Sequence, residues 1–95
     1  MKTAIFCSKP ISPFIILALL PENVTEIIST ENFGFSTHAV AQRLNCSYSL
    51  AESVDEAISQ AEWVFAIWDG LTQGIVDAVK TAKRSGKHVM FSLIP

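Results

Sequence analysis

The sequence predicts an α/β domain built on a parallel sheet, and three observations lead to this prediction. Short apolar runs alternate with segments of helical periodicity along the 95 residues, giving four strand–helix pairs and a closing fifth strand. The run Trp63–Trp68 is apolar throughout, as expected of a strand that is covered on both faces. Apolar residues make up 49% of the chain and charged residues only 17%, which excludes a disordered chain.

The first strand and the first helix are expected within the first twenty residues. Residues 3–7 form a short, largely apolar run that ends in a loop punctuated by Pro10, which predicts a buried strand. Ser12 suits the cap of a helix and Pro13 its first position, so residues 14–20 are expected to be helical.

The second strand and the second helix follow directly. Residues 24–29 are rich in β-branched side chains and predict a strand. Residues 34–45 follow helical spacing, with Ala39, Val40 and Leu44 on the apolar side.

The remaining elements complete the alternation. Residues 46–50 predict a weak third strand, and Ser53 with Glu56 forms a capping box that opens a short helix. After the apolar strand at 63–68, residues 72–85 have the clearest helical pattern, with basic residues toward the carboxyl end and a glycine stop. Residues 88–94 predict the last strand.

Together these elements predict one domain, residues 1–95, with a three-layer, doubly wound, Rossmann-like fold and the strand order 3-2-1-4-5. Ligands of such sheets bind beyond the carboxyl ends of the strands, at the point where the strand order reverses. Here that point lies between the first and fourth strands, at loops 7–9 and 69–74, with loop 30–35 beside them.

These loops have features that favour an anionic ligand. Each opens a helix, whose first N–H groups attract a phosphate, and Lys9 adds a positive charge. Gly34, Gly70 and Gly74 allow close approach to the backbone, although turn geometry alone also explains glycines at such junctions. Trp68 is a candidate for stacking on a base. The candidate ligand-binding residues are Cys7, Ser8, Lys9, Asn32, Gly34, Trp68, Asp69, Gly70, Thr72, Gln73 and Gly74.

Residues 63–90 resemble the small bacterial branch of the SLOG superfamily, a Rossmann-like group that includes the LOG phosphoribohydrolases and DNA-processing proteins. The matches are a strand that ends in Trp-Asp-Gly, a glycine at the start of the next helix, and the end of that helix in Ala-Lys-x-x-Gly-Lys-x-Val. The matching residues are Trp68, Asp69, Gly70, Gly74, Ala82, Lys83, Gly86, Lys87 and Val89. The resemblance implies a nucleotide-derived ligand.

The chain departs from the pattern of this superfamily in the ligand loops. Cys7 stands where the first loop usually has glycine, and Thr30 and Glu31 replace two glycines of the second loop. Ile75 replaces a threonine, and Ala78 stands where the related enzymes carry a catalytic glutamate. The resemblance therefore implies binding without catalysis.

We expect a non-catalytic sensor of a nucleotide or nucleoside-derived ligand, with no cofactor and no metal. One alternative is a nucleoside or nucleotide N-glycosidase that uses Asp69 or Glu31 as its carboxylate, since this cleavage needs a nucleophile or a general base. We expect Asp69 to hold the turn and cap the helix rather than to act chemically. We expect Asp77 to pair with Lys80. A second alternative is a structural or interaction module whose pocket binds no ligand.

Composition also bears on partners. Seven basic and nine acidic residues give a net charge of −2, which argues against non-specific nucleic-acid binding. The longest apolar run, at 14–20, is too short to span a membrane and the start is unlike a signal peptide, so a cytoplasmic protein is expected. Cys7 and Cys46 are too few for a disulfide framework.

The apolar excess predicts a homo-oligomer, most simply a two-fold dimer, through residues 14–20 or the region of Trp63.

Overall fold

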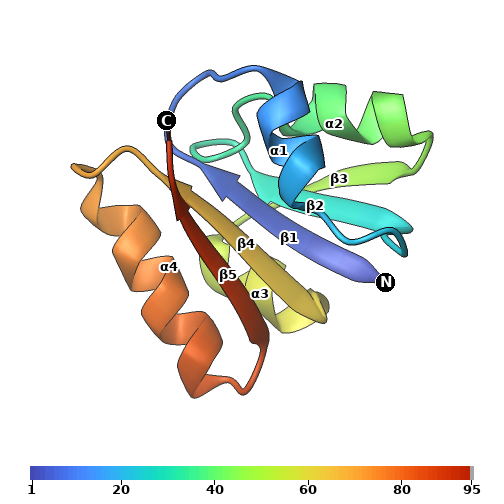
Figure 1. The fold of residues 1–95 in the computed structure, drawn as a ribbon. Helices are drawn as coiled ribbons and strands as arrows, with labels where there is room; N and C mark the ends of the chain where they lie inside the picture. The colour runs from blue at the N-terminus through green and yellow to red at the C-terminus, as the bar shows by residue number, and fades with distance from the viewer. Residues whose placement is uncertain (95) are drawn as a thin grey trace.

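The structure is a computed structural model that describes residues 1–94, and its elements alternate as the sequence predicts (Figure 1). The strands are β1 (Lys2–Cys7), β2 (Glu26–Thr30), β3 (Ser47–Ala51), β4 (Trp63–Trp68) and β5 (His88–Leu93). The helices are α1 (Pro13–Leu19), α2 (Thr37–Leu44), α3 (Val54–Gln60) and α4 (Gln73–Arg84).

The five strands form one sheet in the order β3-β2-β1-β4-β5, and every neighbouring pair is parallel. This confirms the predicted α/β class and the predicted strand order. β1 is central, with Thr3 in register with Ile27 of β2 and with Trp63 of β4. All carboxyl ends therefore lie along one edge of the sheet, where α1 to α4 begin.

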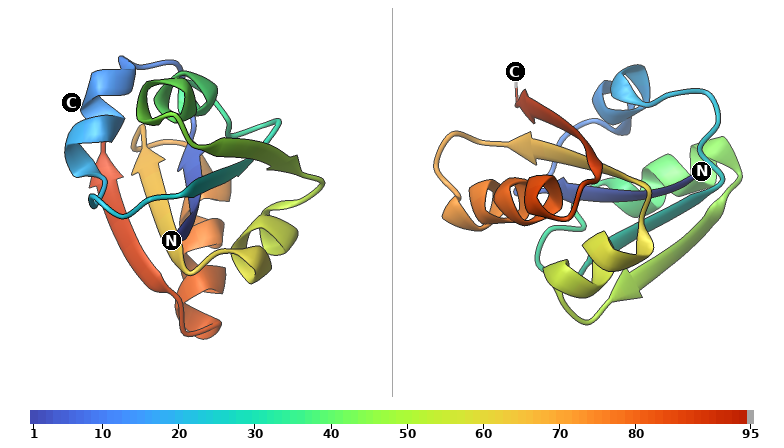
Figure 2. Two further views of the ribbon diagram at one scale, coloured as in Figure 1. Left: turned by 90° about the vertical axis from the view of Figure 1, so that its right-hand side faces the viewer. Right: turned by 90° about the horizontal axis from the view of Figure 1, so that it is seen from below.

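The helices cover the sheet as two layers, α1 and α2 on one face and α3 and α4 on the other (Figure 2). Successive residues of a strand supply opposite faces. In β1, Ile5 therefore joins the core under α1 and α2, and Phe6 joins the core over α3 and α4. Trp63 and Trp68 lie on opposite faces, as their separation of five positions predicts.

The start of the second helix differs from the prediction. α2 begins at Thr37 rather than near Gly34, because Gly34 forms a β-bridge with Cys7 and Ser36 has a left-handed backbone with φ of 66°. The buried face of α2 is accordingly shifted toward the start of the helix and consists of Thr37, Val40 and Ala41, whereas Leu44 is exposed.

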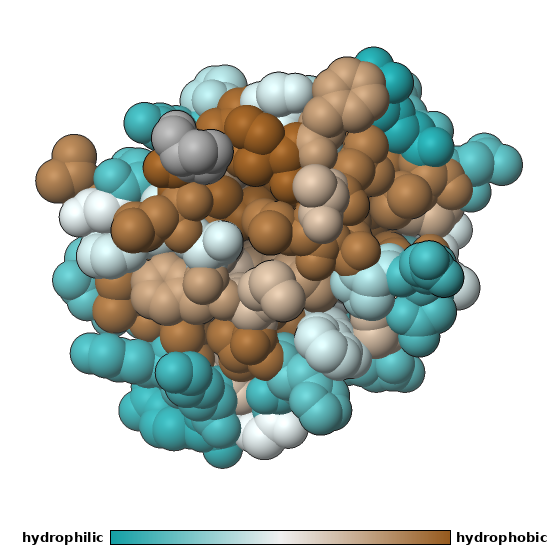
Figure 3. Space-filling view, viewed as in Figure 1, coloured by the Kyte–Doolittle hydropathy of each residue, from teal (hydrophilic) through white to brown (hydrophobic). Residues whose placement is uncertain are grey.

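The helical layer that contains α1 and α2 leaves part of its sheet face open. In Figure 3, apolar side chains gather on the face turned to the viewer, over α1 and the β4–β5 half of the sheet. Phe14 of α1 is 59% exposed, and Met90 of β5 is also exposed. Within residues 1–94, none of the helices combines the length and the apolar character that crossing a membrane requires.

Candidate functional site

The carboxyl ends of β1 and β4 meet at the point where the strand order reverses, as predicted. The two strands are in register up to Cys7 and Ile67, so the loop that begins at Ser8 and the loop that begins at Asp69 are neighbours. This is the crevice in which doubly wound sheets usually bind ligands. The residues that line it determine what it can hold.

Both carboxylate oxygens of Asp69 are engaged in holding its own loop. One carboxylate oxygen accepts hydrogen bonds from the backbone N–H groups of Leu71 (2.9 Å) and Thr72 (2.8 Å), and the other accepts one from the Thr72 hydroxyl (2.8 Å). These bonds, first that of the Thr72 N–H and then that of the Leu71 N–H, lower the pKa of Asp69 to about 2. The Ser8 hydroxyl lies near enough to lower it slightly further, without the geometry of a hydrogen bond. Asp69 thus holds the turn, as predicted, whereas α4 is capped by Thr72 without a side-chain bond.

The first loop offers less than the sequence suggests. Cys7 is completely buried, its Sγ donates to the carbonyl of Lys9 at 3.1 Å, and burial raises the pKa of its thiol. Its backbone N–H donates to the carbonyl of Phe33 at 2.8 Å. Ser8 Oγ is buried without a hydrogen-bond partner among residues 1–94, and the Lys9 side chain is exposed. Within this loop, Ser8 and Lys9 remain candidates for contact with a ligand, and the Cys7 thiol does not.

Phe33 occupies the space next to Gly74 that the sequence assigned to a phosphate. A Cβ built on Gly74 would lie 2.7 Å from Cζ of Phe33. The Phe33 ring also packs edge-on against Phe6, with centroids 6.5 Å apart. Gly74 is therefore explained by the aromatic ring that covers the start of α4. Phe33 was missed because its loop folds back over β1, which no local pattern of the sequence reveals.

The other two candidate glycines also have structural explanations. A Cβ on Gly34 would lie 2.7 Å from the carbonyl oxygen of Thr30, so the tight turn after β2 requires glycine. Gly70 has φ of 85°, which favours glycine, and a Cβ placed on it would meet no atom within 4 Å. Of the three glycines, only Gly70 leaves the backbone open to a ligand.

The remaining candidates around α4 are tied to one another. The Trp68 indole N–H donates to the Thr72 carbonyl at 3.0 Å, and its ring packs against Phe91 at a centroid distance of 5.5 Å. Gln73 donates to Asp77 at 3.1 Å, so among residues 1–94 Asp77 is bound to Gln73 and not to Lys80 as expected. Ala78 is 1% exposed and belongs to the core, which leaves no room for a carboxylate at that position.

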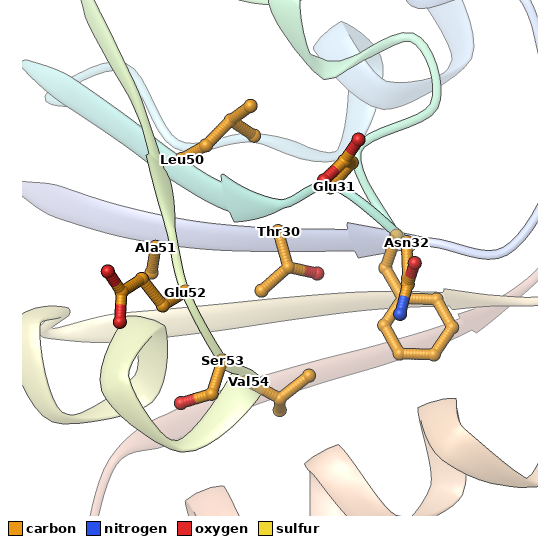
Figure 4. Close-up of a pocket in the computed structure, with 9 residues that line it drawn as sticks. Thr30, Glu31, Asn32, Leu50, Ala51, Glu52, Ser53 and Val54 are labelled. Carbon is orange, nitrogen blue, oxygen red and sulfur yellow. The ribbon is translucent and has the colours of Figure 1, made fainter.

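A cavity of about 320 Å³ lies away from this crevice, beyond the carboxyl ends of β2 and β3 (Figure 4). The residues that line it are Thr30, Glu31, Asn32, Phe33, Leu50, Ala51, Glu52, Ser53 and Val54. Phe33 lines the cavity and also covers Gly74, so its ring separates the cavity from the β1–β4 crevice. The structure thus places Asn32 and Glu31 in a different hollow from Asp69.

Thr30 and Ser53 contribute the two hydroxyl groups of the cavity lining. Thr30 is 4% exposed, and its hydroxyl has no hydrogen-bond partner among the described residues. Ser53 is occupied, since its Oγ accepts from the backbone N–H of Glu56 at 3.1 Å as the capping box predicted. The wall formed by residues 50–54 was not predicted. The signal was present in part, since a capping serine directly after a strand places a helix start at this edge of the sheet.

The described residues contain no cluster of three or more histidine, cysteine, aspartate or glutamate side chains able to hold a metal ion.

No protein family, no curated protein and no solved structure matches this chain.

Proposed function

We propose that this chain is a small ligand-binding domain for a nucleotide or nucleoside-derived molecule, and that it binds without catalysing a reaction. The observation that carries the proposal is the cavity at the carboxyl edge of the sheet, which contains a buried hydroxyl without a partner among residues 1–94. A volume of about 320 Å³ is at the lower end of the ~300–1,000 Å³ that small-molecule sites occupy. The sequence resemblance to the SLOG superfamily supports the same ligand class.

The state of Asp69 supports binding rather than catalysis. A nucleophile or general base needs a free lone pair directed at its substrate, and a general base works best with a pKa near the operating pH. Asp69 has three hydrogen-bond donors on its two oxygens and a pKa of about 2. With Ala78 buried in the core, Glu31 is the remaining carboxylate for the alternative of an N-glycosidase.

The test is binding of a panel of nucleosides and nucleoside monophosphates to the purified chain. A ligand at one hundred times its Kd stabilises the folded state by about 2.7 kcal/mol, which shifts the melting temperature of a domain this small by many degrees. Release of free base from any panel member, lost in Asp69→Asn or Glu31→Gln, would instead establish the N-glycosidase. If no panel member shifts the melting temperature at millimolar concentrations, an interaction module whose pocket binds no ligand is favoured.

We also propose that two copies associate through the β5 edge of the sheet. The N–H of Ile94 donates to Trp68 in β4 at 2.8 Å. Because peptide groups alternate in direction along a strand, Val89, Phe91 and Leu93 turn their N–H and C=O groups away from β4. Among residues 1–94 no strand lies beyond β5, so these groups form an open edge.

That edge is complementary to itself. A two-fold axis perpendicular to the sheet at Phe91 would pair Phe91 with its symmetry mate and Val89 with Leu93, making about six backbone hydrogen bonds. Residues 88–94 contain no lysine, arginine, aspartate or glutamate, so no pair of like charges from these residue types would face each other across the axis. Phe91 and Leu93 are 44% and 65% exposed and would be covered by the second copy.

A further inference from the structure

The backbone of Phe33 is anchored to two strands of the sheet. Its carbonyl accepts a hydrogen bond from the N–H of Cys7 at the end of β1 (2.8 Å), and its N–H donates to the carbonyl of Thr30 at the end of β2 (3.3 Å). The next residue, Gly34, forms a β-bridge with Cys7. The Phe33 ring is therefore carried by a backbone that is tied to β1 and to β2 at their carboxyl ends.

The Phe33 ring separates the cavity from the groups that suit a phosphate. Those groups are Ser8, Lys9 and the open backbone at Gly70, which follow β1 and β4. None of the three lines the cavity, and the ring lies between the cavity and the start of α4, where it would touch a Cβ on Gly74. A ligand seated in the cavity therefore meets an aromatic ring where a nucleotide would need a route to these groups.

The charge of the cavity lining disfavours a phosphate within the cavity itself. Among residues 1–94, the lining contains no lysine, arginine or histidine, whereas Glu31 and Glu52 are both acidic. A phosphate monoester carries a charge of about −1.5 to −2 at pH 7. Its burial without a paired cation is unfavourable, and the two carboxylates add repulsion.

The cavity instead offers groups that suit a neutral ligand. Thr30 is 4% exposed, and its hydroxyl, which can both donate and accept, has no hydrogen-bond partner among residues 1–94. Figure 4 shows this hydroxyl turned toward the side on which Asn32 lies. Because a buried hydroxyl without a partner lowers stability, a neutral ligand that bonds to it recovers free energy. The side chains of Leu50, Ala51 and Val54 add apolar surface for a flat ring.

We propose that the cavity selects the phosphate-free form of its ligand, a nucleoside or a free nucleobase, and that Phe33 determines this specificity. The inference rests on the proposed function and specifies which form of the nucleoside-derived ligand is bound. Replacing the ring with a small side chain joins the cavity to the β1–β4 crevice. A phosphate attached to the same ligand then gains access to Lys9 and Gly70.

The experiment is calorimetric titration of the chain with four nucleobases, their ribonucleosides and the corresponding 5′-monophosphates. The wild-type chain is expected to bind a nucleobase or its nucleoside on the order of tenfold more tightly than the monophosphate, because the phosphate would be buried without a cation. Phe33→Ala is expected to bind the monophosphate at least as tightly as the nucleoside. This gain should shrink at high salt and disappear in the double variant Phe33→Ala/Lys9→Gln, because it comes from a charge pair.

Phe35→Ala is the matched control. Phe35 belongs to the same loop and is 42% exposed, but it does not line the cavity, so its removal should leave the preference unchanged. Phe33→Leu keeps an apolar side chain at the wall and should show a preference between those of the wild type and Phe33→Ala. The wild-type comparison requires no variant, so it tests the inference even where Phe33→Ala does not fold.

Each outcome bears on a different part of the account. A wild-type chain that binds a monophosphate as tightly as its nucleoside overturns the selection and leaves the proposed function standing. A preference that survives in folded Phe33→Ala overturns the role of Phe33. Absence of binding by all of the nucleobases, nucleosides and monophosphates overturns both the inference and the proposed function.

Discussion

The ring of Phe33 lies so close to Gly74 that a Cβ on the glycine would be 2.7 Å from its Cζ atom. Phe33 comes from the loop after β2, and Gly74 lies in the first turn of α4, on the far side of β1. The contact therefore links the two halves of the sheet and fills the space beside Gly74. It also provides the wall between the crevice and the cavity.

This contact predicts that the effect of Gly74→Ala on the free energy of unfolding changes sign when the Phe33 ring is removed. Gly74→Ala should destabilise the wild-type chain by about 1–3 kcal/mol through overpacking. In the Phe33→Ala background the same change should be neutral or stabilising by up to about 1 kcal/mol, because alanine is the better helix former. Urea denaturation of the four proteins measures the coupling. Additive effects would show that Phe33 does not cover Gly74 in solution.

The low pKa of Asp69 predicts loss of stability in acid. Its pKa in the folded chain is about 2, against 3.8 as the reference value, so the folded state favours the ionised form. The stabilisation is complete above about pH 4 and is lost as the pH falls toward 2. Asp69→Asn should therefore melt at a lower temperature than the wild type at pH 6, and the difference should shrink between pH 4 and pH 2. A difference that is constant over this range would contradict the hydrogen bonds described for Asp69.

The buried position of Ala78 predicts that a carboxylate cannot be accommodated there. Ala78→Glu places a carboxylate in the core cluster and should cost about 3 kcal/mol or more, or prevent folding. The matched control is Asp77→Glu, one residue earlier on the exposed face of α4, which should change the free energy of unfolding by less than about 0.5 kcal/mol. Thermal unfolding of both variants measures the two changes in stability. An Ala78→Glu variant as stable as the control would mean that α4 is turned differently on the sheet.

The β5 edge predicts a dimer that a single charge disrupts. Sedimentation at micromolar concentration should give twice the 10.4 kDa mass of the chain. Phe91→Glu should give monomers, because two carboxylates would face each other across the two-fold axis. Leu71→Glu is the control, since Leu71 is 88% exposed but lies in the loop before α4, and it should leave the dimer intact. A wild-type monomer, or a dimer that survives Phe91→Glu, would contradict pairing through β5.

The fold was predictable because its determinants are local. Strands of a parallel sheet are apolar on both faces, and β4 shows this in the unbroken run from Trp63 to Trp68. The capping box of Ser53 and Glu56 marked α3 correctly. The start of α2 was predicted three residues too early, because Gly34 forms a β-bridge with Cys7 and Ser36 has a left-handed backbone.

The site was predictable only in part, because it depends on contacts between distant segments. The carboxyl edge follows from strand order, and the turn held by Asp69 follows from the Asp-Gly pair. The covering of Gly74 by Phe33 and the burial of Thr30 depend on how loop 31–35 crosses the end of β1, which the sequence pattern does not encode. Gly34 and Gly74 are therefore explained by contacts with Thr30 and Phe33 that lie outside the local sequence pattern.

Nuclear magnetic resonance titration of the labelled chain with a ribonucleoside tests the central claim most directly. If the domain binds such a ligand in the cavity, the amide signals that shift should cluster in residues 30–33 and 50–54. The shifts should saturate with added ligand, and Thr30→Val should weaken the binding without altering the spectrum of the free protein beyond its neighbours. Saturating shifts confined to other surfaces, or no shift at millimolar ligand, would contradict the account.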